Sequence, residues 1–440
     1  MRSTRRKFLS QSGRAVAAAT MVTMPGGLTE RVVVASSDTL VFGLIGCGGM
    51  GTFNLLNHLK QPGVVCGGIC DVDADVMERC AAQVEGVSGE RPKKYSDFRE
   101  LLDNKEIDAV VIATPDHWHC LQTVYACQAG KDVYVEKPMA NSIAECDLIV
   151  AAAKKYKRVV QVGQQQRSGQ HWQDVVAFVQ SGDLGKIRRT KIWGYFDYGK
   201  GGPRVPNEVP PAHLDYNMWL GPAPDQPYNP SRLHGSWRHQ WDFGGGLLTD
   251  WGVHLLDIVL LAMNVDGPPK SVSSTGGIYI HNDRAIETPD TLSVLYDMGD
   301  HTMSWEHAGG IEQSIYGRNY GIAFIGENGT LVANRSGWEV IPEEKNGQYL
   351  MQPFPAKSGV QSNHALHAIN FIEAIKSRSE TICTVEDGRL AALYAHMGNI
   401  AYRSGSRLAW DTEKNEFKDN PQANEFLKPA YREPWKWPAL

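Results

Sequence analysis

Short apolar runs alternate with stretches of helical spacing through the first part of the chain. Five runs have the length and composition of buried strands: Val41–Ile45, Val64–Ile69, Ile107–Ala113, Asp132–Val135 and Val159–Val162. Helices are expected at Thr52–Leu59, at His119–Ala129, and from a cap at Asn141 or Ser142 to about Tyr156. Strands that alternate with helices predict an α/β domain on a doubly wound parallel sheet. We place this domain at residues 37–163.

The pattern changes from about Gln164. Segments with strand character now predominate and include Arg189–Tyr195, Leu292–Tyr296 and Gly321–Ile325. A proline- and tryptophan-rich excursion runs from Gly199 to Gly246, and helices are expected at Asn363–Ser377 and Val385–Tyr402. A length of 440 residues suits two domains. Residues 164–440 are therefore predicted to form a second α/β domain on a mixed sheet.

The N-terminus has the features of an export signal. Thr4-Arg5-Arg6-Lys7-Phe8-Leu9 resembles a twin-arginine motif, and a weakly apolar stretch from Ala15 to Met24 follows it. Val33-Val34-Ala35 offers small side chains to a signal peptidase. We therefore predict that residues 1–36 are a signal peptide and linker, and that the protein reaches the periplasm folded, by the twin-arginine route.

Composition limits the partners. The first 35 residues carry six basic and one acidic residue, which leaves 38 basic and 48 acidic residues and a net charge of −10. This acidic balance argues against nucleic acid or an anionic membrane as a partner, and no later apolar run is long enough to cross a bilayer. Seven of the eight cysteines fall between Cys47 and Cys146 without C-x-x-C pairs, so we interpret them as buried thiols and expect no metal.

The first strand ends in a glycine-rich turn. Gly46, Gly48 and Gly51 form G-x-G-x-x-G, with Cys47, Gly49 and Met50 as the intervening residues. This pattern is typical of a strand, a tight turn and a helix N-terminus that binds a pyrophosphate. Asp71 ends the next apolar run, where an acidic residue binds the ribose hydroxyls of a dinucleotide. No arginine follows Asp71, so we favour NAD over NADP.

Polar residues also follow the later strands. Thr114-Pro115 and Glu136-Lys137-Pro138 stand directly after two of the predicted strands. Ligands of doubly wound sheets gather at these carboxyl ends. Asp250 and His254 stand four residues apart in Leu247–Leu261, which is predicted as a largely apolar helix. Residues at this spacing share one helix face, so both side chains are expected at one site.

These motifs occur in a recognisable order. G-x-G-x-x-G, a strand-end Asp, Ala-Thr-Pro-x-x-x-His, Glu-Lys-Pro and Asp-x-x-x-His together resemble the glucose–fructose oxidoreductase / inositol dehydrogenase (Gfo/Idh/MocA) family, from about Thr39 to Arg403. The resemblance implies an N-terminal Rossmann domain that carries nicotinamide and a C-terminal α/β domain with an open sheet that carries substrate. It also implies hydride transfer at a ring carbon of a sugar or cyclitol, and a homo-oligomer, dimer or tetramer.

The resemblance also assigns roles to residues. It places Thr114, Pro115, His119, Glu136 and Gln165 beside the cofactor, with an unusual peptide bond often found before Pro138. Lys137 would hold the reacting hydroxyl as well as line the nicotinamide side. We assign His254 as general base, because a near-neutral imidazole accepts a proton readily, and Asp250 as the residue that orients the sugar or the histidine.

Aromatic and paired polar side chains suggest a sugar as substrate. Flat rings stack on sugar C–H surfaces, and Arg and Asp bind hydroxyl pairs. The substrate-binding candidates, besides Asp250 and His254, are Arg167, Trp193, Tyr195, Trp237 and Arg238. His117 and His119 lack nearby carboxylates or cysteines and are not interpreted as metal ligands.

Three functions fit the sequence. The first is a periplasmic sugar or glycoside dehydrogenase that oxidises a ring hydroxyl, with C3 as one candidate carbon. The second is an NAD-dependent glycosidase that acts by oxidation, elimination and reduction. The third is a non-enzymatic sugar sensor, against which Lys137, Asp250 and His254 speak. Because the periplasm should hold little free NAD, export implies a tightly bound cofactor that is restored on the enzyme.

Overall fold

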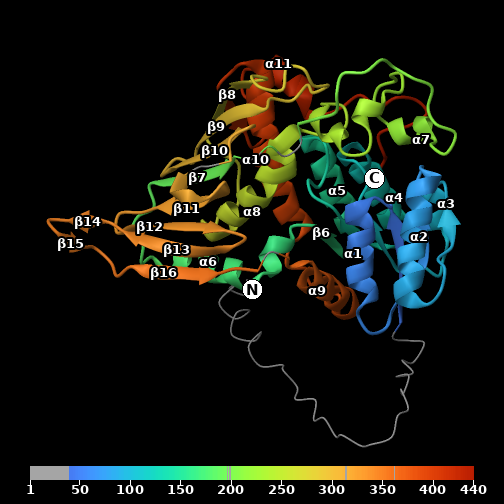
Figure 1. Cartoon of the computed structure of the whole chain (residues 1–440), viewed down its shortest axis with the longest axis horizontal. Coiled ribbons are helices and arrows are strands. Elements are labelled where there is room, and N and C mark those ends of the chain that lie inside the picture. Colours follow the sequence, from blue (N-terminus) through green and yellow to red (C-terminus); the bar gives the residue numbers. More distant parts are fainter. Residues whose placement is uncertain (1–38, 196, 198–199, 313–314, 361) are drawn as a thin grey trace, which may run out of the picture. The chain divides into compact units, whose positions relative to one another are not determined.

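The computed structural model describes residues 39–440 except 196, 198–199, 313–314 and 361. The predicted signal at residues 1–36 lies outside the described residues. Residues Thr39–Leu440 form one unit, and its helices and strands are shown in Figure 1.

A six-stranded parallel sheet forms the first half of this unit. Its order is β3-β2-β1-β4-β5-β6. The strands are β1 Leu40–Ile45, β2 Val64–Cys70, β3 Lys94–Tyr95, β4 Ala109–Ile112, β5 Asp132–Val135 and β6 Val160–Val162. The connecting helices are α1 Gly49–Leu59, α2 Ala74–Ser88, α3 Phe98–Asp103, α4 Asp116–Gln128 and α5 Ile143–Tyr156. The prediction of a doubly wound sheet is confirmed.

Side chains of the central strands alternate between two helical layers. In β4, Val111 packs with the layer of α1 and α2, whereas Val110 and Ile112 pack with the layer of α3, α4 and α5. Helix α9, His364–Ser377, comes from far along the chain and completes the first layer through Phe371 and its neighbours. Because successive side chains of a strand point to opposite faces and both sets are apolar here, each face of the sheet is covered by helices.

The second sheet is mixed and has ten strands, in the order β16-β13-β12-β11-β7-β10-β9-β8-β17-β18. Its strands are β7 Arg189–Gly194, β8 Ser271–Gly277, β9 Thr291–Asp297, β10 Thr302–Ala308, β11 Tyr320–Ile325, β12 Gly329–Asn334, β13 Gly337–Pro342, β16 Phe354–Ser358, β17 Leu408–Asp411 and β18 Glu416–Phe417. A separate hairpin joins β14 Glu344–Lys345 to β15 Gln348–Tyr349. Only β7 and β10 run parallel within this sheet's described pairings.

Three helices cover one face of the second sheet and bury the largest core cluster. They are α6 Gln170–Ser181, α8 Val253–Ala262 and α10 Val385–Ser404. The smaller elements are α7 Tyr216–Leu220, α11 Pro421–Asn424, η3 Gln165–Ser168, η4 Pro230–Arg232, η5 Ser236–His239, η7 Ile315–Gly317 and η8 Glu425–Leu427. None of the described helices is both long and apolar enough to span a membrane.

The helix that carries Asp250 differs from its prediction. It begins with a π-helical segment, η6 Leu248–Gly252, and continues as α8. In a π-helix each turn takes more residues than the 3.6 of an α-helix, so regular spacing alone does not place Asp250. Its position depends on tertiary packing.

Candidate active site

The glycine-rich turn fits a dinucleotide phosphate. Gly46 has a φ of +93°, which a side chain would strain, and a Cβ at Gly51 would overlap the carbonyl oxygen of Gly46. A Cβ at Gly48 or Gly49, in contrast, would meet no atom within 4 Å. The turn therefore leaves open space over the N-terminus of α1, where backbone N–H groups can bind a pyrophosphate.

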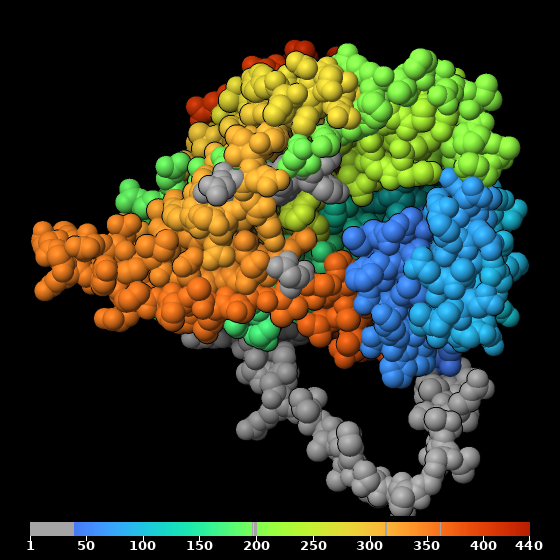
Figure 2. All heavy atoms as spheres, viewed as in Figure 1, coloured from blue at the N-terminus to red at the C-terminus, as the bar shows by residue number. Residues whose placement is uncertain are grey.

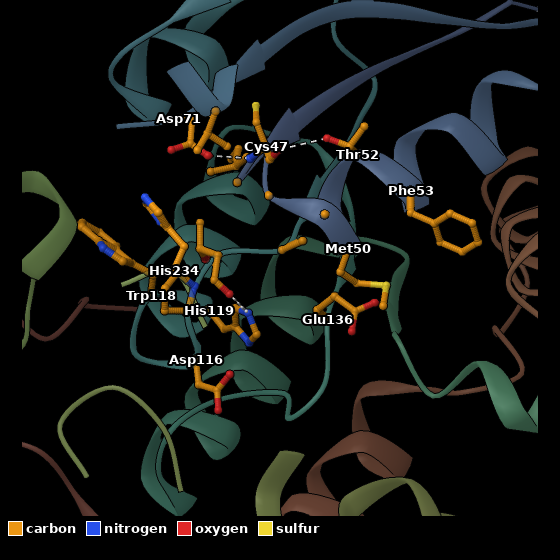
Figure 3. A pocket seen from close by; sticks show the side chains of 18 of the residues that line it. Cys47, Met50, Thr52, Phe53, Asp71, Asp116, Trp118, His119, Glu136 and His234 are labelled. Atoms are coloured by element: carbon orange, nitrogen blue, oxygen red, sulfur yellow. Dashed lines mark hydrogen bonds between the residues drawn. The ribbon is translucent and has the colours of Figure 1, made fainter. Parts of the chain in front are cut away.

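Asp71 lies beside this turn at the end of β2. Its Oδ2 accepts a hydrogen bond of 2.6 Å from the Cys47 N–H, and its Oδ1 accepts one of 3.0 Å from the Asp73 N–H (Figure 3). Burial raises the pKa of the Asp71 carboxyl, and these two N–H donors lower it in part. The carboxylate is thus fixed at the sheet edge where the ribose hydroxyls are expected.

The substitution Asp71→Ala is expected to weaken cofactor binding at least ~10-fold, because a charged hydrogen-bond acceptor is lost. Nucleotide content and the NAD dissociation constant of the purified protein measure this. Asp75→Ala, on the exposed side of α2, is the matched control. Cofactor binding of wild-type strength in Asp71→Ala would contradict the assignment.

His119 is a structural residue at the cofactor side. Its Nδ1 lies 2.8 Å from the carbonyl oxygen of Pro138, and its Nε2 lies 2.9 Å from that of Thr114. Burial lowers the pKa of His119 to about 4. The neutral imidazole donates its single N–H to one of these two carbonyls and packs against the other, between the ends of two strands and beside the cis Lys137–Pro138 bond. His117 is likewise bound to the Trp219 carbonyl, at 3.1 Å.

Glu136 and Lys137 directly follow strand β5, and their side chains contact different partners. The Asn54 Nδ2 donates a 2.7 Å hydrogen bond to the buried Glu136 carboxyl, whose pKa burial raises. The Lys137 Nζ lies 2.6 Å from the Asp250 Oδ1 and 2.9 Å from the Asp250 carbonyl oxygen. Lys137 therefore joins the first domain to the π-helical segment of the second.

Asp250 is held by two cations. Arg238 Nε donates to the same Oδ1 at 3.1 Å, and the Arg238 guanidinium stacks over Trp237 at 4.4 Å. Burial raises the pKa of Asp250, but Lys137 and Arg238 outweigh burial and hold it well below its ordinary value. Asp250 is therefore an anion at neutral pH and fixes the ammonium group of Lys137.

His254 lines the same cavity from the first turn of α8. It is buried, its Nδ1 has no partner, and its imidazole makes no hydrogen bond within the described part of the chain. Burial lowers the pKa of His254 well below its ordinary value, and Lys137 and Arg335 lower it further. The imidazole is therefore neutral at pH 7 and has a lone pair for a substrate proton.

The low pKa of His254 predicts a pH profile. Because the neutral form is the base, kcat/KM should persist as pH falls below about 6.5, the pKa of an unperturbed histidine, and decline only at lower pH. Removal of the positive charge at Arg335 should raise the His254 pKa, so that the decline of kcat/KM at low pH begins at a higher pH. The measurement is kcat/KM as a function of pH from about 4 to about 9, roughly the range in which the titration of a histidine base affects the rate. An acid limb above 6.5 in the unsubstituted protein would contradict the assignment.

One cavity of about 730 Å³ collects these residues from both domains. Of the predicted cofactor residues, those that line it are Gly46, Cys47, Gly48, Gly49, Met50, Asp71, Thr114, Pro115, His119, Glu136, Lys137 and Gln165. Of the predicted substrate and catalytic residues, Lys137, Trp237, Arg238, Asp250 and His254 line it. Gly51 lies behind the turn, where it permits close packing.

Three predicted substrate residues do not line this cavity. Arg167 forms a buried pair with Asp257, with nitrogen–oxygen distances from 2.7 to 3.0 Å. Trp193 is 0% exposed, and its Nε1 donates to the Arg318 carbonyl. Tyr195 donates its hydroxyl hydrogen bond to Glu306 in the sheet. Their polar groups form hydrogen bonds or ion pairs within the second domain, so the substrate roles predicted for these three residues are not supported.

Sequence reasoning missed other residues of the cavity wall. Asp116, Trp219, Trp251, Arg335 and His364 all line it. Asp116 begins α4, and burial raises its pKa well above the ordinary value although Lys137 and Arg238 oppose this. The tryptophan content is the only sequence signal for Trp219 and Trp251. Arg335 and His364 belong to no motif.

The proline- and tryptophan-rich excursion covers the ribose end of the cavity. Asp73 forms an antiparallel bridge with Leu214, and the Ala74 N–H donates to the His213 carbonyl at 2.9 Å. His234, which lines the cavity, lies 2.9 Å from the Asp73 Oδ2. In Figure 2 the excursion, in green, lies against the blue start of the first domain. A bound dinucleotide would therefore be enclosed on this side.

Family models match most of the described chain. One, described as an oxidoreductase family with an NAD-binding Rossmann fold, matches residues 40–164. Its companion, the C-terminal alpha/beta domain of the same family, matches residues 169–314 and 341–437. The chain belongs to the Gfo/Idh/MocA oxidoreductase family. It is thus an NAD-binding oxidoreductase, as the motif order predicted.

Three individual proteins similar to this chain have sequence identities of 20% to 27%. The chain is 23% identical over 384 residues to the uncharacterized oxidoreductase YrbE of Bacillus subtilis, covering 86% of this chain and 99% of that one. It is 27% identical over 204 residues to a glycosyl hydrolase family 109 protein of Shewanella pealeana, covering 42% of this chain and 45% of that one. A levoglucosan dehydrogenase structure, in complex with NADH and levoglucosan, has a TM-score of 0.63 at 20% identity, covering 84% and 99% of the two chains.

Proposed function

We propose that this protein oxidises a ring hydroxyl of a sugar or glycoside in the periplasm, with NAD that stays bound through many turnovers. The observation that carries this proposal is one cavity that joins Lys137, Asp250 and His254 to the glycine-rich turn and Asp71. The levoglucosan dehydrogenase that has a similar fold supports a sugar as the class of substrate. The carbon oxidised, with C3 as one candidate, belongs to the proposal.

The chain's own residues account for the proton and for the substrate's position. Bound NAD supplies the hydride acceptor. The Lys137 ammonium, fixed by Asp250, donates to the reacting hydroxyl oxygen and favours its deprotonation. The neutral His254 imidazole takes the proton of the reacting hydroxyl as hydride leaves the carbon that bears this hydroxyl. Trp237 and Trp251, with Arg238 and Arg335 over their rings, line the cavity in which the sugar would lie.

Cofactor retention is supported by the excursion that covers the ribose end. Its contacts through Leu214, His213 and His234 all reach the segment that follows Asp71. Export as a folded protein, proposed from the twin-arginine motif, would require such retention. We also propose that the sheet face opposite α6, α8 and α10 joins copies of the chain, with partly exposed Leu295 and Ile341 among its strand residues.

A glycosidase reaction is the second candidate. The similarity to glycosyl hydrolase family 109 proteins favours it, although the match spans less than half of those chains. In that reaction, oxidation acidifies a neighbouring C–H, elimination releases the aglycone, water adds to the unsaturated keto-sugar, and hydride returns to the carbonyl carbon.

The two candidates differ in their products. The experiment incubates the purified protein with a panel of glycosides, with and without an added electron acceptor, and identifies the products by mass spectrometry. A keto-sugar that accumulates only with acceptor indicates the dehydrogenase. Release of aglycone without acceptor indicates the glycosidase. Unchanged sugars and unchanged nucleotide in every incubation would contradict both.

A further inference from the structure

Arg335 is a largely enclosed cation in the turn between β12 and β13, and it lines the cavity. Its Nε donates a 2.8 Å hydrogen bond to the Gln166 Oε1. Its guanidinium lies over the Trp251 ring, 4.6 Å from the centroid. Gln166 in turn donates to the His254 carbonyl at 3.2 Å. The guanidinium plane is therefore held in a defined orientation near the proposed base.

The outer nitrogens of this guanidinium are unused. Nη1 and Nη2 of Arg335 make no hydrogen bond, and Arg335 forms no ion pair, within the described part of the chain. Burial is the largest influence on the Arg335 pKa and lowers it, and the neutral Tyr320 phenol and the Asp250 carboxylate act to a smaller extent in the opposite direction. An enclosed cation without a carboxylate is costly, and a guanidinium fork matches a carboxylate in two parallel hydrogen bonds.

The surrounding charges do not supply that carboxylate. Lys137 and Arg238 both pair with the Asp250 carboxylate. The other buried carboxyls of the cavity, Asp116 and Glu136, have raised pKa values and make no ion pair with Arg335. The histidines near Arg335, His254 and His364, have lowered pKa values, that of His364 being about 4, and are neutral. The second-domain end of the cavity therefore holds excess positive charge, although the chain as a whole is acidic.

We propose that Arg335 binds a carboxylate of the substrate, so that the substrate class is an acidic sugar, a uronic acid or its glycoside. This inference rests on the proposed sugar oxidation and narrows it. The cofactor's pyrophosphate is the other anion of the complex, but the glycine-rich turn and the N-terminus of α1 provide its place in the first domain. Arg335 comes from the sheet of the second domain and remains available to substrate.

The test compares matched neutral and acidic sugars. The probes are methyl glucoside, galactoside and mannoside and the three corresponding methyl glycosiduronates. Binding to the NAD-loaded protein is measured by calorimetry, and oxidation is measured by nicotinamide fluorescence. The variants are Arg335→Gln, Arg335→Lys and, as a control for charge loss on the exposed side of the same domain, Arg188→Gln.

The unsubstituted protein is expected to bind and oxidise at least one glycosiduronate about 10-fold or more better than its neutral partner. Arg335→Gln should lose about 10- to 100-fold of kcat/KM on the glycosiduronate, mainly through KM, because a bidentate charged contact is removed. The loss of kcat/KM on the neutral partner should be smaller, so the preference for the glycosiduronate over the neutral sugar should fall. Arg335→Lys should recover part of the loss, and Arg188→Gln should behave as the unsubstituted protein.

Each other outcome overturns a different statement. Equal or better use of neutral sugars by the unsubstituted protein overturns the acidic-sugar inference and leaves sugar oxidation standing. Loss of bound nucleotide from Arg335→Gln, with no change in sugar preference, assigns Arg335 to a cofactor phosphate instead. Absence of binding and oxidation with all six sugars contradicts the inference and the proposed function together.

Discussion

Replacement of His254 by alanine is expected to lower the rate of hydride transfer by about 100- to 10,000-fold, the contribution typical of a positioned general base. His254 is buried in the cavity, neutral at pH 7, and bound to no other side chain in the described structure. His119, another neutral histidine of the cavity, lies within hydrogen-bond distance of two backbone carbonyls, whereas the His254 imidazole has no such partner among the described residues. The NAD-binding turn and Asp71 are unaffected, so nucleotide content should be unchanged.

The measurement for His254→Ala combines single-turnover reduction of bound NAD with nucleotide content. His301→Ala, in the turn between β9 and β10, is the control for histidine loss away from the cavity. Turnover at the unsubstituted rate in His254→Ala would remove His254 as the base. Loss of both activity and nucleotide would indicate a structural role.

Replacement of Lys137 by alanine is expected to lower kcat/KM by about 100-fold or more, because the donor to the reacting hydroxyl is lost. In the described structure, the Asp250 side chain accepts hydrogen bonds from the Lys137 Nζ of the first domain and from Arg238 of the second. Arg238 still pairs with Asp250, so the carboxylate does not become an isolated buried charge, and the fold should survive. Lys137→Arg should not restore activity, since a planar guanidinium presents its donors differently from an ammonium.

For Lys137→Ala, kcat/KM is compared with the thermal unfolding midpoint and the nucleotide content. A loss of activity with a small change in the unfolding midpoint supports a direct role. Activity within about threefold of the unsubstituted protein, far less than a catalytic donor contributes, would exclude Lys137 from the reaction.

The fold and the cofactor half of the site follow from local sequence patterns. β5 spans Asp132–Val135 as predicted, and α5 ends at Tyr156 with Ser142 as its cap. Parallel strands align their carboxyl ends, so the sequence alone predicts that Asp71, Thr114 and Lys137 lie at one edge of the sheet. Here the information lies in short-range periodicity and in turns that only glycine permits.

The substrate half depends on contacts that periodicity does not encode. Trp193 and Arg167 have side chains suited to binding a sugar. However, Trp193 is buried in the core against the second sheet, and Arg167 forms a buried ion pair with Asp257. Arg335 stands in an ordinary turn between two strands, and only the packing of the second sheet brings it to the cavity. Which polar residue faces substrate and which satisfies a structural partner is decided by tertiary geometry.

The nucleotide content of the purified protein, and its response to sugar, decides whether this chain is a sugar oxidoreductase that retains NAD. The full chain is expressed, and the cytoplasmic and periplasmic fractions are separated to test the proposed export. The protein is then purified and denatured, and the released nucleotide is identified by mass spectrometry, before and after incubation with the sugar panel. We expect near-stoichiometric NAD or NADH, with the reduced share rising when a sugar substrate is added. A purified protein without nucleotide, or one whose nucleotide does not respond to any sugar, would contradict this expectation.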